Sequence, residues 1–259
     1  MHPQLFHFEF PFSSHQFTLY TYAFCIVIGT LLAALYTKWS AKKELGIVQL
    51  PNTFFYIIFI AGFVGGKLFF YLERPLHFWS NPKLMLHNFS GGFVFYGSFI
   101  TIIPIVIWYL KKHKIPVLPM LDILAITTII AHSLGRVGCF NAGCCYGSPT
   151  NSSFGIVFPT SNHVAVHPTQ LYEATTLVLL AISLLYIKKR QQFKGQIFIL
   201  YIGMYAIFRA ILELFRGDKR GFIIEGVLSH SQFIAILILL TAIFFYIKLK
   251  TKHKLTLNN

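Results

Sequence analysis

Seven long apolar segments set the strongest limit on how this chain can fold. They cover about residues 17–37, 52–73, 92–110, 118–138, 168–187, 195–215 and 230–248. A helix needs about 20 mostly apolar residues to cross the hydrocarbon core of a bilayer. The alternating ten-residue strands of a membrane barrel do not occur in this sequence, which leaves helices as the way to satisfy the backbone in lipid. The sequence therefore predicts an all-α integral membrane protein with seven transmembrane helices.

The composition agrees with a surface that faces lipid. Of 259 residues, 55% are hydrophobic and only 12% are charged, whereas a soluble domain carries about 25% charged residues. The net charge of +14 could indicate a nucleic-acid partner, but most basic residues lie in short loops between the apolar segments. We therefore expect the lipid bilayer as a partner, no nucleic acid, and a single membrane domain over residues 1–259. The N-terminus lacks the features of a cleavable signal peptide.

The loop charges predict how the chain is oriented in the membrane. Fourteen Lys and Arg residues lie in the loops after the first, third and fifth segments and in the C-terminal tail, against five on the opposite side. Because cytoplasmic loops are rich in Lys and Arg, we expect the N-terminus outside and the C-terminus in the cytoplasm. The loop of residues 139–167 then lies outside, and its turn-forming residues predict that it is at least partly ordered.

Three charged residues follow one another on one helical face in the sixth segment. Arg209, Glu213 and Arg216 are spaced by four and three residues. They form either an ion-pair ladder that neutralises itself or a cationic wall that keeps one guanidinium for an anion. Arginine suits a phosphate because its fork binds two oxygens at once.

Arg136 lies near the end of the fourth segment and is a second candidate for binding an anion. It lies near Gly138, where the absence of a side chain permits close backbone approach. Arg136 is either an interfacial residue that reaches the membrane surface or part of an anion site shared with the sixth segment. The anion expected at that depth is a phospholipid head group.

Three of the four cysteines follow Arg136 in SLGRVGCFNAGCCYG. Outside a cell they would face an oxidising compartment. Four alternatives stay open: a disulfide from Cys139 to Cys144 or Cys145, a metal site, a reactive thiol, or inert free thiols. A bond between the neighbours Cys144 and Cys145 would be strained. The spacing of the three residues lacks the usual zinc pattern, although a neighbouring histidine could add a ligand.

The string HPTQLYEA opens the fifth segment with further polar residues. Gln170 and Glu173 share a helical face and form either interhelical hydrogen bonds or contacts to a ligand. His167 is either a surface residue at the helix end or a contact to a phosphate or a proton near Gln170 and Glu173. His132 either lines a cavity or is simply buried. Asp122, at the start of the fourth segment, is expected to favour the dipole of its own helix.

Four strings occur in the order and spacing typical of the bacterial phosphatidylglycerol–prolipoprotein diacylglyceryl transferase family. They are GGFVFYG (91–97), LGRVGCFNAGCCYG (134–147), HPTQLYEA (167–174) and YAIFRAILELFR (205–216). TYAF (21–24) and GFVGGKLFFYL (62–72) also resemble segments of that family, the latter with Lys67 where an arginine is usual. The resemblance covers nearly the whole chain, and it implies a seven-helix enzyme of the bacterial inner membrane.

The resemblance also implies an activity. The family moves a diacylglyceryl group from phosphatidylglycerol to the lipobox cysteine thiol of a prolipoprotein and releases glycerol phosphate. Phosphatidylglycerol and lipobox-containing prolipoproteins would be the partners, and the chemistry requires no cofactor and no metal. Two alternatives are a paralogue with another acceptor or lipid, and a non-catalytic membrane protein with a metal or dithiol site.

Residue by residue, the resemblance implies a catalytic group made of Arg136, Arg209, Tyr96 and Glu213. The arginines would stabilise the leaving phosphate, and Glu213 would orient Arg209 or accept a proton. The residues expected to bind substrate are Tyr22, Arg136, Gly138, Gly147, His167, Gln170, Glu173 and Arg216.

Besides Lys67, the chain departs from the family pattern at three positions. The family usually has Asn at the position of Cys139, an acidic residue at that of Cys144, and often His at that of Tyr96. Because tyrosine is a poor base at neutral pH, Tyr96 is expected either to orient a substrate or to relay a proton. The cysteines are expected to brace the loop around Arg136.

Overall fold

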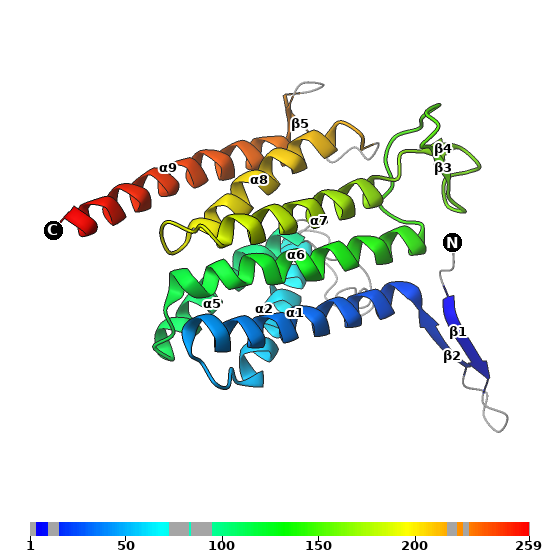
Figure 1. Cartoon of the computed structure of the whole chain (residues 1–259). Coiled ribbons are helices and arrows are strands. Elements are labelled where there is room, and N and C mark those ends of the chain that lie inside the picture. The colour runs from blue at the N-terminus through cyan, green and yellow to red at the C-terminus, as the bar shows by residue number, and fades with distance from the viewer. Residues whose placement is uncertain are drawn as a thin grey trace. The chain divides into compact units, whose positions relative to one another are not determined.

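The computed structural model describes residues 4–9, 16–72, 83, 95–216, 222–224 and 228–258, which form helices and three short hairpins (Figure 1). The helices are α1 (Thr21–Leu45), α2 (Asn52–Leu72), α5 (Phe95–Lys112), α6 (Val117–Ala142), α7 (Thr169–Lys188), α8 (Gln196–Glu213) and α9 (His230–Asn258). The hairpins pair β1 (Gln4–Glu9) with β2 (Gln16–Tyr20), β3 (Ile156–Val157) with β4 (Ala165–Val166), and β5 (Phe222–Ile224) with β6 (Leu228–Ser229), all antiparallel. Each predicted apolar segment overlaps one helix of the described chain.

Six helices of the described chain are long and apolar enough to cross a membrane. They are α1, α2, α6, α7, α8 and α9. The remaining helix, α5, contains Pro104 and ends in Lys111 and Lys112, and these lysines lower its mean hydropathy. The predicted class of all-α membrane protein is confirmed, while the crossing by α5 stays a prediction.

The helix ends differ from the predicted segments in two places. Residues 17–20, expected to begin the first helix, instead pair with the N-terminal strand in β2, so α1 begins at Thr21 and continues to Leu45. Helix α9 continues past residue 248 to Asn258. Hydropathy marks only the apolar part of a helix, whereas lysine continues a helix at little cost. The predicted order in the loop of residues 139–167 is confirmed, because α6 extends into it and β3 and β4 pair there.

The chain divides into two compact units, residues 1–40 with 121–259, and residues 41–120. In the smaller unit, α2 and α5 approach closely because glycines face the partner helix. The Ser98 hydroxyl donates a hydrogen bond to the carbonyl of Gly62 over 2.7 Å, and a Cβ on Gly65 would collide with Thr101. Small residues that permit such approach are the usual basis of helix association in membranes.

In the larger unit, α6, α7 and α8 enclose a common apolar core. Its buried members are Ala125, Ile126, Ile129, Leu177, Leu180, Leu184, Ile197 and Tyr201. Tyr36 of α1 packs against this core, and the hydroxyls of Thr37 and Thr127 lie 2.7 Å apart between α1 and α6. Figure 1 shows α6, α7 and α8 running alongside one another. The three helices thus form a packed frame that carries the polar side chains described below.

Asp122 lies in α6 and is almost fully buried, yet it stabilises the start of a different helix. Its Oδ2 accepts hydrogen bonds from Gln191 Nε2 (2.5 Å) and from the backbone N–H of Gly195 (2.7 Å), and its Oδ1 accepts one from the N–H of Phe198 (2.9 Å). The two backbone N–H groups, of Gly195 and Phe198, lie at the start of α8, where they have no partner inside the helix. The expectation that Asp122 serves the dipole of its own helix was therefore wrong.

Replacing Asp122 with alanine is expected to destabilise the folded protein by about 1–3 kcal/mol, because one buried and two partly buried donors lose this acceptor. Asp122→Asn, which keeps one acceptor oxygen, should lose less. Thermal unfolding in detergent, followed by circular dichroism, measures both changes. If the two variants were as stable as the native chain, the cap would contribute nothing.

Candidate functional site

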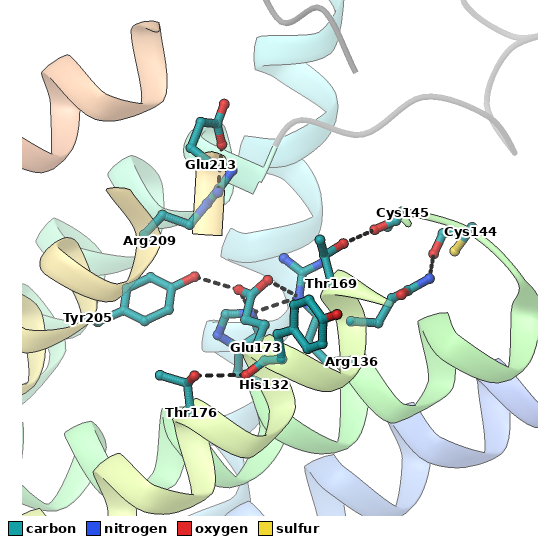
Figure 2. A network of polar contacts seen from close by, with 12 residues as sticks. His132, Arg136, Cys144, Cys145, Thr169, Glu173, Thr176, Tyr205, Arg209 and Glu213 are labelled. Atoms are coloured by element: carbon teal, nitrogen blue, oxygen red, sulfur yellow. Dashed lines mark hydrogen bonds and ion pairs between the residues drawn. The ribbon is translucent and has the colours of Figure 1, made fainter. Parts of the chain in front are cut away.

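A buried polar network joins α6, α7 and α8 in the larger unit, with Glu173 at its centre (Figure 2). Glu173 Oε2 lies 3.0 Å from Nε of Arg136, and Oε1 accepts a hydrogen bond of 2.9 Å from the Tyr205 hydroxyl. The side chain of Glu173 is only 4% exposed. Because an isolated carboxylate at this depth would be costly, the positive charge of Arg136 offsets the penalty of burying it.

His132 is the fourth member of this network. Its Nε2 lies 3.3 Å from Glu173 Oε1 and 3.4 Å from Nε of Arg136. One ring nitrogen cannot accept a hydrogen bond from Arg136 and donate one to Glu173 at the same time. With the proton on Nε2, His132 donates to Oε1 of Glu173, while Oε2 forms an ion pair with Arg136. This tautomer pairs all three groups, and the imidazole also packs edge-on against Tyr205.

Arg136 contributes only its Nε to the contacts found within the described part of the chain. A guanidinium carries four further N–H groups on its two Nη atoms, and these are the groups that bind a phosphate through two oxygens. The side chain is 20% exposed, so a ligand can reach it. Glu173 thus holds Arg136 in place by one nitrogen and leaves the fork for an anion.

Arg209 and Glu213 form a second ion pair, along α8. Arg209 Nη1 lies 2.7 Å from Glu213 Oε2, and both side chains are buried at 10% and 8% exposure. Neither atom has a well-aligned hydrogen bond in the described chain, so the contact is chiefly electrostatic. Arg209 also lies close enough to Glu173 to interact with its charge. The prediction that charged residues share one helical face is confirmed for Arg209 and Glu213. Arg216 lies beyond the end of α8, after a turn.

The amide nitrogen of Gln170 binds a loop of the protein and is therefore not available to a ligand. The side chain is fully buried, and its Nε2 donates to the carbonyl of Cys144 over 2.6 Å. The hydroxyl of Thr169 donates to the carbonyl of Cys145 over 2.9 Å (Figure 2). Of the two alternatives for Gln170, the structure favours hydrogen bonding within the protein, from a helix to a loop.

His167 and Gly147 lie in a small ladder of backbone hydrogen bonds that closes the loop of residues 139–167. The N–H of Gly147 donates to the His167 carbonyl (2.8 Å), and the N–H of Ser148 donates to the Phe215 carbonyl (2.9 Å). The His167 ring packs against Phe215, and its Nδ1 lies 3.2 Å from the Tyr172 hydroxyl. Both predicted residues therefore have a structural role beside the end of α8.

Gly147→Ala is expected to lower the stability of the folded protein by about 1–3 kcal/mol, as overpacking does. The added Cβ would collide with the Phe215 carbonyl oxygen and lie 2.9 Å from the Cβ of His167, and backbone cannot yield cheaply. Gly135→Ala is the matched control, because its Cβ would meet only Ile26 at an ordinary 3.5 Å. Unfolding temperatures of the two variants test this difference, and equal values would contradict it.

Tyr22 and Gly138 lie together where α1 meets the end of α6. A Cβ on Gly138 would lie 3.0 Å from the Cβ of Cys25 and 3.2 Å from Cδ2 of Tyr22. Gly138 therefore permits close packing of the two helices. The side chain of Tyr22 is 43% exposed, which leaves it accessible to a substrate.

Tyr96 belongs to α5, but its side chain lies outside the described residues. Residues 91–94 of the same motif also lie outside them. Its expected catalytic role therefore stays a prediction.

The four cysteines are free thiols, so the disulfide, one of the alternatives for these residues, is not the arrangement found. The Sγ atoms of Cys139, Cys144 and Cys145 nevertheless lie within 4.8 Å of one another. Hydrogen bonds from the two neighbouring thiols, and then the charge of Arg136, lower the pKa of Cys145. Bracing of the loop comes from α7, through Thr169 and Gln170, and not from a covalent bond.

Sequence reasoning missed Tyr205 and left the place of His132 undecided. Each lies four residues before a predicted arginine, His132 before Arg136 and Tyr205 before Arg209. A spacing of four residues places two side chains on one helical face, and this signal could have found both.

Residues 10–248 match the family described as prolipoprotein diacylglyceryl transferase. The phosphatidylglycerol–prolipoprotein diacylglyceryl transferase of Clostridium tetani is 36% identical over 233 residues, which cover 88% of this chain and 92% of the relative. Two further relatives with that activity in their names come from Clostridium perfringens (33% identical, covering 88% and 90%) and Rickettsia canadensis (34%, covering 87% and 90%).

Proposed function

This chain belongs to the prolipoprotein diacylglyceryl transferase family, and we propose that it transfers the diacylglyceryl group of phosphatidylglycerol to the lipobox cysteine of prolipoproteins. The chain is a transferase with several membrane-crossing helices. In the proposed reaction, the thiolate sulfur of the acceptor attacks the glyceryl carbon that carries the phosphate. The carbon–sulfur bond forms as the carbon–oxygen bond breaks, and glycerol phosphate leaves with the electron pair.

The observation that carries this proposal is the buried pair of Arg136 and Glu173. The carboxylate fixes the guanidinium through Nε at 3.0 Å, which directs the remaining N–H groups to an anion. Negative charge builds up on the phosphate as the carbon–oxygen bond breaks, and preorganised donors stabilise it without rearranging. Arg209, oriented by Glu213, supplies a second positive charge close to the same carboxylate.

The acceptor thiol must lose its proton before it attacks, because only the thiolate is a good nucleophile. A site of low water content favours the reaction, since it strengthens the attraction between the arginines and the phosphate. The burial of Glu173, Arg209 and Glu213 supports such a site.

We further propose that α5 crosses the membrane as a seventh span and that the chain forms one domain in the bacterial inner membrane. The excess of Lys and Arg in alternate loops supports an N-terminus outside and a C-terminus in the cytoplasm. The site at the ends of α6 and α8 would then lie at the outer leaflet.

The proposed function is tested by following labelled diacylglyceryl from phosphatidylglycerol vesicles to a lipobox peptide. The native chain should label the peptide thiol and release glycerol phosphate in equal amounts. Arg209→Ala should lose most of this activity, while Arg190→Ala, in a loop between α7 and α8, should keep it. A native chain that labels no peptide under conditions in which the Clostridium tetani relative does would contradict the proposal.

A further inference from the structure

Three thiols converge at the end of α6. Cys139 lies in the last turn of α6, and Cys144 and Cys145 lie in the cysteine loop, residues 143–147, that follows it. The three Sγ atoms lie within 4.8 Å of one another, and each is a free thiol. Nothing in the proposed transfer reaction uses them.

The backbone of the cysteine loop is held so that the thiols stay together. The N–H of Cys144 donates to the carbonyl of Cys139 over 3.2 Å, while α7 binds the two loop carbonyls through Gln170 and Thr169. Cys145 has a φ of 63°, in the left-handed region that residues other than glycine rarely adopt. A residue keeps such a strained backbone conformation only where the surrounding structure enforces it, and residues of this kind cluster at functional sites.

This geometry suits a metal ion better than a disulfide. A disulfide would use two thiols and leave the third without a function, and a bond between the adjacent residues Cys144 and Cys145 is disfavoured by disulfide geometry. Zinc–sulfur bonds of about 2.3 Å place the sulfurs of a tetrahedral site about 3.8 Å apart, so the thiols would need to close by no more than about 1 Å.

We propose that Cys139, Cys144 and Cys145 bind one thiophilic cation of the zinc class through three thiolates. Soft sulfur ligands select such ions over magnesium or calcium. No His, Asp or Glu of the described chain joins the three thiols within the same distance, so water fills the fourth position of the tetrahedron. The ion fixes the cysteine loop one helical turn from Arg136, and this role does not depend on the proposed function.

The test uses the full-length protein, reduced, stripped with a chelator and kept in detergent. Zn²⁺ alone is added, and bound metal is measured after equilibrium dialysis. One ion should bind per chain, and Co²⁺ should give the charge-transfer absorption of thiolate ligands. Removing a residue that only contacts a metal ligand lowers metal affinity by about 10–100-fold. Removing a ligand itself, as in Cys139→Ser, Cys144→Ser or Cys145→Ser, should therefore lower the Zn²⁺ affinity by at least as much.

Cys25→Ser is the matched control, since Cys25 lies in α1 and outside the thiol cluster, and it should bind Zn²⁺ like the native chain. The unfolding temperature of each variant without metal shows whether it is folded. Zn²⁺ binding that survives all three substitutions, or no stoichiometric binding to the native chain, would overturn the proposal. A disulfide between Cys139 and either loop cysteine, found by mass spectrometry in protein extracted without reductant, would also overturn it.

Discussion

Replacing Arg136 with lysine is expected to slow diacylglyceryl transfer by about 10²-fold or more, since removing one donor that stabilises a developing negative charge costs about 10²–10³. Lysine keeps the positive charge and can still pair with Glu173, but it has no planar fork for two phosphate oxygens. The effect should therefore fall on the rate and leave the fold largely intact. Initial rates at saturating lipobox peptide measure it.

Arg136→Ala should lose more activity than Arg136→Lys, yet part of that loss would come from a carboxylate left buried without its partner. The lysine variant separates the two effects, provided that its unfolding temperature stays near that of the native chain. Arg190→Lys, outside the network, is the control. If the lysine variant transferred diacylglyceryl as fast as the native chain, a positive charge alone would suffice for catalysis. The guanidinium of Arg136 would then not bind the phosphate through two oxygens.

Replacing Glu173 with alanine is expected to destabilise the protein by about 3–5 kcal/mol, the usual cost of removing one partner of a buried ion pair. Arg136 would remain in a largely buried position without its counter-charge, and the Tyr205 hydroxyl would lose its acceptor. Denaturant or thermal unfolding in detergent measures the loss.

Two variants separate the contributions of Glu173. Tyr205→Phe removes a single hydrogen bond to a charged group and should cost about 1.5–3 kcal/mol. Glu44→Ala, at an exposed carboxylate near the end of α1, should change stability by less than about 0.5 kcal/mol. An alanine variant of Glu173 that unfolds like the Glu44 control would mean that the network does not hold the helices together.

Local sequence determined the class of fold and the positions of the helices. Runs of apolar residues specify membrane helices because lipid leaves the backbone no other way to pair its polar groups. The spacing of Arg209 and Glu213 placed them on one face of α8 because the helical period is itself local. The motif strings likewise predicted that Arg136 and Glu173 belong to the candidate site, and the structure brings these two residues together as an ion pair.

Tertiary structure decided which of these residues meet and what each one does. Asp122 caps α8 from α6, Gln170 of α7 holds the cysteine loop, and residues 17–20 pair as a strand. In each case the partners lie on separate elements, some of them more than 70 residues apart. Helical period and hydropathy describe each segment alone, whereas these contacts depend on how the segments pack. A buried polar group binds whatever partner that packing supplies, because leaving it unpaired would cost more than any local preference.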